Sequence, residues 1–278
     1  MTYKTILVHL DAAKGIESRL DIAFSLAQKF DAHLVGLHAL SVTPLPGWAI
    51  AEAGEFIEKA QAKARAALAE QGRKAWDAAV QRSNCSKCEW RSAINDALDA
   101  VTLHARYADL VVIGQDDGSG TNGLTRDFEQ HLLLGAGRPV LVVPYARDKR
   151  PVGNKVLIAW NASQEATRAV TDALPLLQSA KQVQVAAFNA GRKGGMHGDV
   201  PGADIGLYLS RHGVKVTVSQ YQADDVDVGN QLLSRAADLD SDLIVMGAYG
   251  HSRMSELILG GVTRTLLESM TVPVLMSH

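Results

Sequence analysis

The chain has few of the residues that define several large classes of protein. Its 278 residues include only two cysteines, Cys85 and Cys88, which excludes a disulfide-stapled fold and agrees with a reducing compartment. Prolines number 8 and aromatic residues make up 5%, while hydrophobic residues make up 47%, so the disordered and collagen-like classes are also excluded. What remains is a folded globular protein, and its length allows roughly two domains.

Long apolar runs and an excess of one charge are missing as well. The apolar runs fall far below the ~20 residues that cross a bilayer. The first residues, MTYKTILVHLD, contain too short an apolar core for a secretory signal. Lys and Arg number 28 against 30 Asp and Glu, a net charge of -2, so no overall field attracts nucleic acid or an acidic membrane. We therefore expect a cytoplasmic protein with neither of these partners.

The chain does contain an internal repeat with a period near half its length. Three pairs of segments match in order and spacing. They are ILVHLD at 6–11 with VLIAWN at 156–161, ADLVVIG at 108–114 with SDLIVMG at 241–247, and PVLVV at 139–143 with PVLMS at 273–277. The sequence therefore predicts two copies of one domain, over residues 1–147 and 153–278, joined by a polar segment near 146–154.

Strands and helices alternate in each copy. The matched runs are almost wholly apolar, as in parallel strands buried on both faces. Apolar residues at helical spacing over 16–30 and 166–177 directly follow the first strand of each half. This alternation predicts an α/β fold of two doubly wound domains, each a parallel sheet flanked by helices.

The copies differ in their middle segments. An Ala-, Glu- and Lys-rich stretch predicts a long surface helix over 49–80, followed by a strand over 88–93. The second half has a glycine-rich connector and a shorter helix over 203–211 instead. Pro139 and Pro273 begin short apolar strands that we expect at sheet edges, where they are open to pairing.

A glycine pattern follows the strand at 241–246. Gly247 and Gly250 enclose two residues, and nine residues later Gly260 and Gly261 open a predicted helix. Glycine lets the backbone turn sharply and approach a ligand closely, and the N–H groups at a helix N-terminus attract anions. Ligands of doubly wound sheets bind outside the carboxyl ends of the strands. The pattern therefore predicts a cradle for phosphate.

This Gly-x2-Gly-x9-Gly pattern resembles that of the universal stress protein family. Strands ending in Asp11 or Asn161 and the repeated Asp-Leu and Pro-Val-Leu segments extend the resemblance over nearly all of both halves. The resemblance implies a tandem member with a five-stranded parallel sheet per domain, of the adenine nucleotide alpha-hydrolase-like type, paired about a pseudo-two-fold axis. It also implies binding of ATP or AMP, often with a divalent metal such as Mg²⁺, and a role in the stress response.

The resemblance also implies the nucleotide-binding residues. Gly247 would pass close to the ribose, the segment after Gly250 would face the phosphates, and the amides from Gly260 onward would donate to them. Two positions depart from the family pattern, because Gly261 stands in place of Ser or Thr and Asn161 in place of Asp. The full predicted set is Asn161, Gly247, Gly250, His251, Ser252, Arg253, Gly260, Gly261, Val262 and Thr263, the last as a substitute hydroxyl.

The first half lacks the corresponding glycines. Gly114 is followed by Gln115, Asp116 and Asp117, and the next predicted helix begins near Arg126-Asp127-Phe128 instead of with glycines. Carboxylates at this position would repel phosphate. We interpret the first half as a degenerate copy that serves as scaffold, or that binds something other than a triphosphate.

Motifs for catalysis are missing from both halves. No Gly-Lys-Ser/Thr, His-Glu-x-x-His or Gly-x-Ser-x-Gly occurs, and no Gly-x-Gly-x-x-Gly follows the first strand of either half. The lack of a Gly-Lys-Ser/Thr motif favours holding nucleotide over turning it over, and we assign no catalytic residue and no metal site. Cys85 and Cys88 are most simply a pair of reduced thiols, with a redox or metal role as the alternative.

Two other functions and a homodimeric state stay open. The glycines could form only turns, in which case the chain would be a nucleotide-free interaction protein or scaffold with paired domains. A slow metal-assisted ATPase is another alternative. The two halves could also pair with a second chain as a homodimer.

Overall fold

The protein is described from a computed structural model. It covers residues 2–11, 13, 15–41, 47–93, 96–118, 123–125, 127–146, 150–188, 202–222, 227–249 and 261–278.

The two halves repeat one order of strands and helices, as the sequence predicts. The first half contains β1 (Thr5–Leu10), α1 (Ile16–Phe30), β2 (His33–His38), α2 (Gly47–Ser83), β3 (Cys88–Ser92), α3 (Ala97–Ala105), β4 (Leu110–Gly114), α4 (Phe128–Gly135) and β5 (Val140–Val143). The second half contains β6 (Lys155–Trp160), α5 (Gln164–Ser179), β7 (Gln182–Phe188), α6 (Ala203–Arg211), β8 (Val216–Tyr221), α7 (Val228–Asp238), β9 (Leu243–Gly247), α8 (Gly261–Ser269) and β10 (Val274–Ser277).

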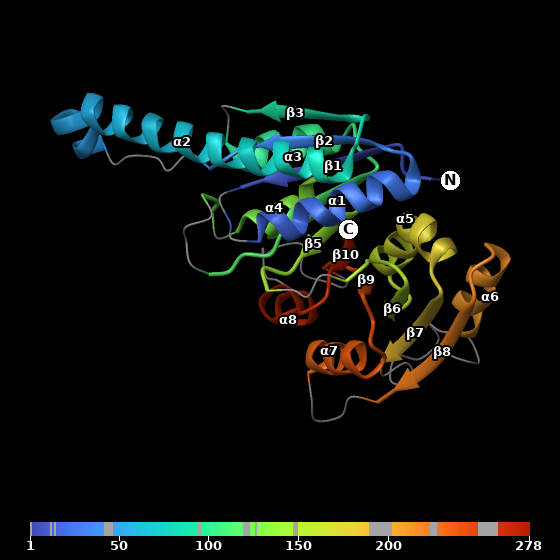
Figure 1. Cartoon of the computed structure of the whole chain (residues 1–278). Helices are drawn as coiled ribbons and strands as arrows, with labels where there is room; N and C mark the ends of the chain where they lie inside the picture. The colour runs from blue at the N-terminus through green and yellow to red at the C-terminus, as the bar shows by residue number, and fades with distance from the viewer. Residues whose placement is uncertain are drawn as a thin grey trace.

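The described strands form one sheet in the order β3-β2-β1-β4-β5-β10-β9-β6-β7-β8. Pairing is parallel within each half, and β5 and β10 join the halves as an antiparallel pair in which Leu141 lies opposite Leu275. The edges expected at Pro139 and Pro273 therefore pair with each other inside the chain. This junction lies at the centre of the molecule (Figure 1).

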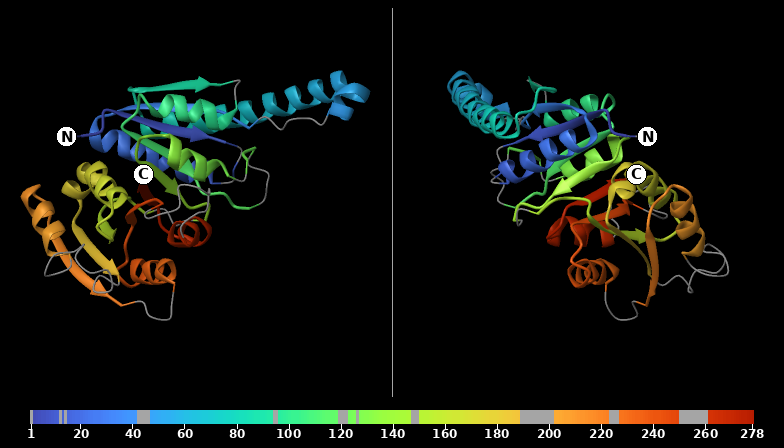
Figure 2. Two further views of the ribbon diagram at one scale, coloured as in Figure 1. Left: turned by 180° about the vertical axis from the view of Figure 1, so that it is seen from behind. Right: turned by 45° about the vertical axis from the view of Figure 1, so that its right-hand side comes forward.

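Alternating residues of the strands face two helical layers. The core on one face combines Ile6, Val8 and Leu275 with residues of α1, α2, α5 and α6. The core on the other face combines Leu7 and Met276 with residues of α3, α4, α7 and α8. Each core draws on both halves, so the halves share their hydrophobic burial, and Figure 2 shows the helices on both sides of the sheet.

The repeated Asp of the Asp-Leu segments has the same structural role in each half. Asp109 Oδ2 accepts hydrogen bonds from the backbone N–H groups of Lys4 and Thr5, at 2.7 and 3.0 Å. Asp242 Oδ1 accepts from Gly153 and Asn154, at 2.8 and 3.0 Å. Each carboxylate thus satisfies free amides where the chain enters the central strand of its half.

The long helix α2 extends beyond the end of the sheet (Figure 1). Its surface carries ion pairs between residues four apart, which favour helix even without packing. These pairs are Lys59 with Glu55 at 2.6 Å, Lys74 with Glu70 at 2.7 Å, and Arg73 with Asp77 at 2.9 Å. The predicted surface helix is confirmed, with an additional turn toward its C-terminal end.

We expect the two halves to unfold together, because both cores cross the β5–β10 junction. Leu275→Ala should lower the free energy of unfolding by about 2–5 kcal/mol and keep a single transition for the whole chain. Urea unfolding followed by circular dichroism and by tryptophan fluorescence measures the free energy of unfolding and the number of transitions. Leu103→Ala, at a side chain in α3 that is about half exposed, is the control and should change stability by less than about 0.5 kcal/mol. Two separate transitions would contradict the shared core.

Candidate functional site

The strand order reverses at β6 in the second half. β6 pairs with β7 on one side and with β9 on the other. Ligands of doubly wound sheets bind outside the carboxyl ends of the strands at such a reversal. Asn161 directly follows β6 and Gly247 is the last residue of β9, so the fold brings these two predicted residues to the ends of neighbouring strands.

The start of α5 lies against both residues. Asn161 Oδ1 accepts a hydrogen bond from Ser163 N at 3.1 Å, and Ser163 Oγ caps the helix by accepting from Ala166 N at 3.1 Å. A Cβ on Gly247 would stand 2.5 Å from Ala166 N, closer than any side chain can approach. Packing against α5 is thus a sufficient reason for glycine at 247. Asn161 itself is exposed.

Helix α8 contributes an exposed N-terminus. Gly261 is its first residue and is exposed, and among the described residues outside its own helix no atom lies within 4 Å of the position that a Cβ would take. Val262 is partly buried, and Thr263 is buried with 3% of its surface exposed. Arg264, a candidate phosphate partner, pairs with Glu268 at 2.8 Å on the exposed side of the helix.

The rest of the predicted cradle cannot be placed. Gly250, His251, Ser252, Arg253 and Gly260 lie outside the described residues. Of the predicted set, the structure therefore positions Asn161, Gly247, Gly261, Val262 and Thr263.

Arg19 fills the corresponding position in the first half. β1 lies between β2 and β4, and Asp11 follows β1 as Asn161 follows β6. Arg19 Nη2 forms an ion pair with Asp11 Oδ1 at 2.9 Å, and Nη1 donates to the carbonyl oxygen of His9 at 2.7 Å. A Cβ on Gly114 would clash with this guanidinium, which lies directly against the end of β4. The Arg19 and Asp11 side chains are only 1% and 2% exposed.

The ion pair sets the charge of this buried region. Burial raises the pKa of Asp11, but the Arg19 guanidinium, His9 and the Ala13 N–H outweigh burial and hold the pKa below its usual value. Burial lowers the pKa of His9 to about 4, so its ring is neutral at pH 7. Because Asp11 already neutralises the one guanidinium, that cation is not free to bind a phosphate.

The first half also lies close to the start of the glycine pattern in the second half. Tyr249 follows β9, and its buried hydroxyl has no hydrogen-bond partner among the described residues. Burial, and then the carboxylates of Glu129 and Asp127, raise the pKa of Tyr249 to about 12. Both acidic residues are at the start of α4, so the first half forms part of the surroundings of this site.

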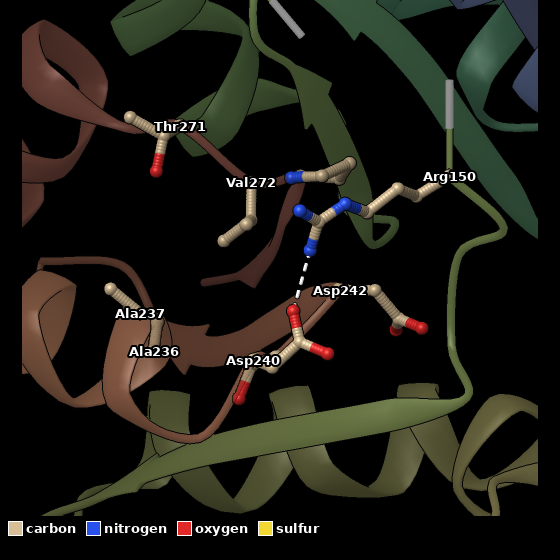
Figure 3. Close-up of a pocket in the computed structure, with 9 residues that line it drawn as sticks. Arg150, Ala236, Ala237, Asp240, Asp242, Thr271 and Val272 are labelled. Carbon is tan, nitrogen blue, oxygen red and sulfur yellow. Dashed lines mark hydrogen bonds and ion pairs between the residues drawn. The ribbon is translucent and has the colours of Figure 1, made fainter. Parts of the chain in front are cut away.

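Two cavities lie away from the predicted site, at the amino ends of strands. One, of about 260 Å³, lies where β9 and β10 begin, and there Arg150 Nη1 donates to Asp240 Oδ1 at 2.5 Å (Figure 3). The other, of about 420 Å³, lies between α1 and the segment 150–154. Neither cavity is lined by a residue of the predicted set.

Membrane-spanning helices and metal sites are both missing from the described ranges. No described helix combines the length and the apolarity that a membrane span requires. Within the same ranges, three His, Cys, Asp or Glu side chains nowhere come together as a metal site.

Comparison with known proteins identifies the family. The model of the universal stress protein family matches residues 2–144 and 208–278. The chain belongs to the universal stress protein family. A comparison with curated proteins finds no match.

Solved structures share the fold of this universal stress protein. A universal stress protein from Archaeoglobus fulgidus DSM 4304 aligns over 98% of this chain and 95% of its own, with a TM-score of 0.71 and 15% identity. A functionally unknown protein from Pseudomonas aeruginosa PAO1 aligns over 99% and 92%, with a TM-score of 0.59 and 15% identity. These neighbours show the adenine nucleotide alpha-hydrolase-like fold, and the predicted fold class is confirmed.

Sequence reasoning did not single out two buried charged residues of this universal stress protein, Arg19 and Glu129. Arg19 had a detectable signal, because it lies three residues after Ile16 and one before Leu20, on the apolar face of its helix. Glu129 had none, since it looks like an ordinary acidic residue in the first turn of α4.

We expect Arg19→Ala to lower the free energy of unfolding by about 3–5 kcal/mol, because Asp11 would be left buried without its partner. The double variant Asp11→Asn/Arg19→Ala copies Asn161 and Ala169 of the second half. Because it removes both charges, it should lose less stability than Arg19→Ala alone. Urea unfolding at pH 7 compares them. Arg82→Ala, which breaks an exposed pair with Asp21 at 3.0 Å, should change stability by at most about 1 kcal/mol. Equal losses in the single and double variants would contradict the ion-pair account.

Glu129 should make stability depend on pH. Burial, together with the Asp116 and Asp11 carboxylates, raises its pKa from 4.5 to about 8, although the Asp116 N–H lowers it. The folded protein therefore keeps a proton that the unfolded chain releases, so this stabilisation is complete below pH 4.5 and is lost as the pH rises through about 8.

We expect Glu129→Gln to flatten this fall, because the amide has no proton to lose. Unfolding free energies of both proteins, measured at intervals between these two pH values and above, provide the test. Glu268→Gln, at an exposed carboxylate, is the control and should keep the wild-type slope. A Glu129→Gln variant with the wild-type slope would show that Glu129 is ionised in the folded protein.

Proposed function

We propose that the second half of this universal stress protein, over residues 153–278, binds an adenine nucleotide, ATP or AMP. The nucleotide would lie outside the carboxyl ends of β6 and β9, with its phosphates on the N-terminus of α8 and Mg²⁺ as a companion of ATP. The first half, over residues 1–147, would act as scaffold. Occupancy of the site would regulate or buffer a stress response in the cytoplasm, without dedicated catalysis.

The contrast between the two strand reversals carries this proposal. In the first half, Arg19 occupies the space at the end of β4 and Asp11 is buried beneath it. In the second half, the position corresponding to Arg19 is Ala169, whose methyl group cannot reach across, and Asn161 is exposed. The end of β4 is thus filled by a charged side chain in the first half, whereas the end of β9 in the second half packs against the start of α5 and carries no such charge.

The chemistry of α8 suits a phosphate. The first N–H groups of a helix have no partner within it, and the helix dipole adds partial positive charge there. The open space at Gly261 lets a ligand approach these amides without meeting a side chain. Among the described residues, Asn161 is the polar side chain that best suits the nucleoside, because an amide can both donate and accept hydrogen bonds.

The proposal is tested first by looking for nucleotide. Protein purified without added nucleotide is heat-denatured, and the released small molecules are identified by mass spectrometry. ATP and AMP, with and without Mg²⁺, are then titrated into the nucleotide-free protein by calorimetry. Release of an adenine nucleotide, or saturable binding below millimolar concentration, supports the proposal. No release and no binding would favour the interaction-protein alternative.

We expect Gly260→Val to abolish nucleotide binding and leave the fold intact. A branched side chain just before α8 would stand where phosphate approaches the amides. Calorimetric titration measures the affinity, and circular dichroism checks the fold. Gly261→Ala is the matched control, because its methyl group meets no atom within 4 Å. Unchanged affinity in Gly260→Val would place the nucleotide elsewhere.

We expect Gly261→Ser to tighten binding by about tenfold or more, since a hydrogen bond to a charged phosphate contributes about 1.5–3 kcal/mol. The open space at Gly261 accommodates the larger residue, and the serine restores the hydroxyl that the family pattern has at this position. Gly261→Ala separates the effect of the hydroxyl from that of the added carbon. If serine and alanine give the same affinity, the phosphates do not contact this residue.

A further inference from the structure

The turn between α2 and β3 holds the two cysteines together. Cys88 Sγ donates to the carbonyl oxygen of Cys85 at 3.4 Å, and the Cys85 side chain lies near enough to raise the pKa of Cys88. Asn84, directly before them, adopts a left-handed backbone with φ of 49°, which tightens the turn. The turn therefore holds the two cysteine side chains next to each other, as the reduced form of a potential disulfide would.

The surroundings favour dithiol chemistry over metal binding. Both cysteines are partly buried and pack against the core on the side of α1 and α2. No third metal-binding side chain joins them among the described residues. The sequence contains no other cysteine, so each thiol has one possible partner within the chain.

The two thiols differ in their readiness to react. Burial, and then the neighbouring Cys85 sulfur, raise the pKa of Cys88 to about 11. Because the thiolate is the nucleophile, Cys88 reacts slowly with an oxidant at neutral pH. This leaves Cys85 as the thiol that an oxidant meets first.

We propose that Cys85 and Cys88 form a reversible disulfide when the protein meets a peroxide. The Cys85 thiolate attacks one peroxide oxygen, the O–O bond breaks, and Cys85 becomes a sulfenic acid. The other oxygen leaves as hydroxide and takes up a proton to become water. The Cys88 sulfur then attacks the Cys85 sulfur, the S–S bond forms, and the sulfenic oxygen leaves as a second water. Two thiols are oxidised and one peroxide is reduced.

The disulfide would join the base of α2 to the edge strand. Cys88 is the first residue of β3 and pairs with Leu34 of β2, whereas Cys85 follows the end of α2. Oxidation would therefore restrain the turn at the C-terminal end of α2, the end that packs on the sheet, independently of whether nucleotide is bound.

The test treats the reduced full-length protein with hydrogen peroxide. In the wild type, free thiols should fall from two to none, the intact mass should fall by two hydrogen atoms, the chain should stay free of intermolecular disulfides, and dithiothreitol should reverse every change. Cys88→Ser should instead trap a sulfenic acid on Cys85 that a dimedone probe labels. Cys85→Ser should be labelled more than about tenfold more slowly, because burial keeps the pKa of the remaining thiol, Cys88, above its ordinary value.

Other outcomes would overturn the proposal. These are two unreacted thiols, conversion directly to sulfinic acid, disulfides between chains, or equal labelling of the two serine variants. Circular dichroism of the reduced variants establishes that each is folded. Zn²⁺ that binds the reduced protein stoichiometrically and protects both thiols from peroxide would assign the pair to a metal instead.

Discussion

The ion pair between Arg19 and Asp11 distinguishes two halves that are otherwise built alike. A buried guanidinium is tolerated because a carboxylate 2.9 Å away and the carbonyl oxygen of His9 accept hydrogen bonds from its two Nη atoms, although its Nε has no hydrogen-bond partner among the described residues. This ion pair occupies the carboxyl ends of β1 and β4 in the first half. With Ala169 in place of Arg19, the second half has no such side chain, and Asn161 stays exposed.

The antiparallel pairing of β5 with β10 joins the two different halves into one molecule. The two halves share a sheet and both hydrophobic cores, so neither is an independent appendage. Glu129 and Asp127 of the first half act on Tyr249 beside the glycine pattern of the second. The first half thus forms part of the surroundings of the glycine pattern in the second half.

Much of this arrangement could be predicted from the sequence, because the spacing of apolar residues reflects the strands and helices directly. The apolar strands, the helices at 16–30 and 203–211 and the repeat all follow from patterns that local packing imposes. The position of Arg19 at the ends of β1 and β4 could not be predicted in this way, because a buried arginine depends on contacts between α1, β1 and β4. Gly247 shows another limit of sequence-based prediction. A glycine there suggests a ligand, but the packing of α5 against Gly247 already explains why the residue is glycine.

The central claim is that nucleotide binds where Arg19 has no counterpart. Photolabelling with 8-azido-ATP, followed by digestion and mass spectrometry, locates the bound base directly, and competition with unlabelled ATP identifies specific adducts. The account predicts adducts that ATP suppresses on peptides from residues 153–278, in particular those that contain Asn161 or Gly261. Specific adducts on peptides that contain Asp11, Arg19 or Gly114 would contradict it.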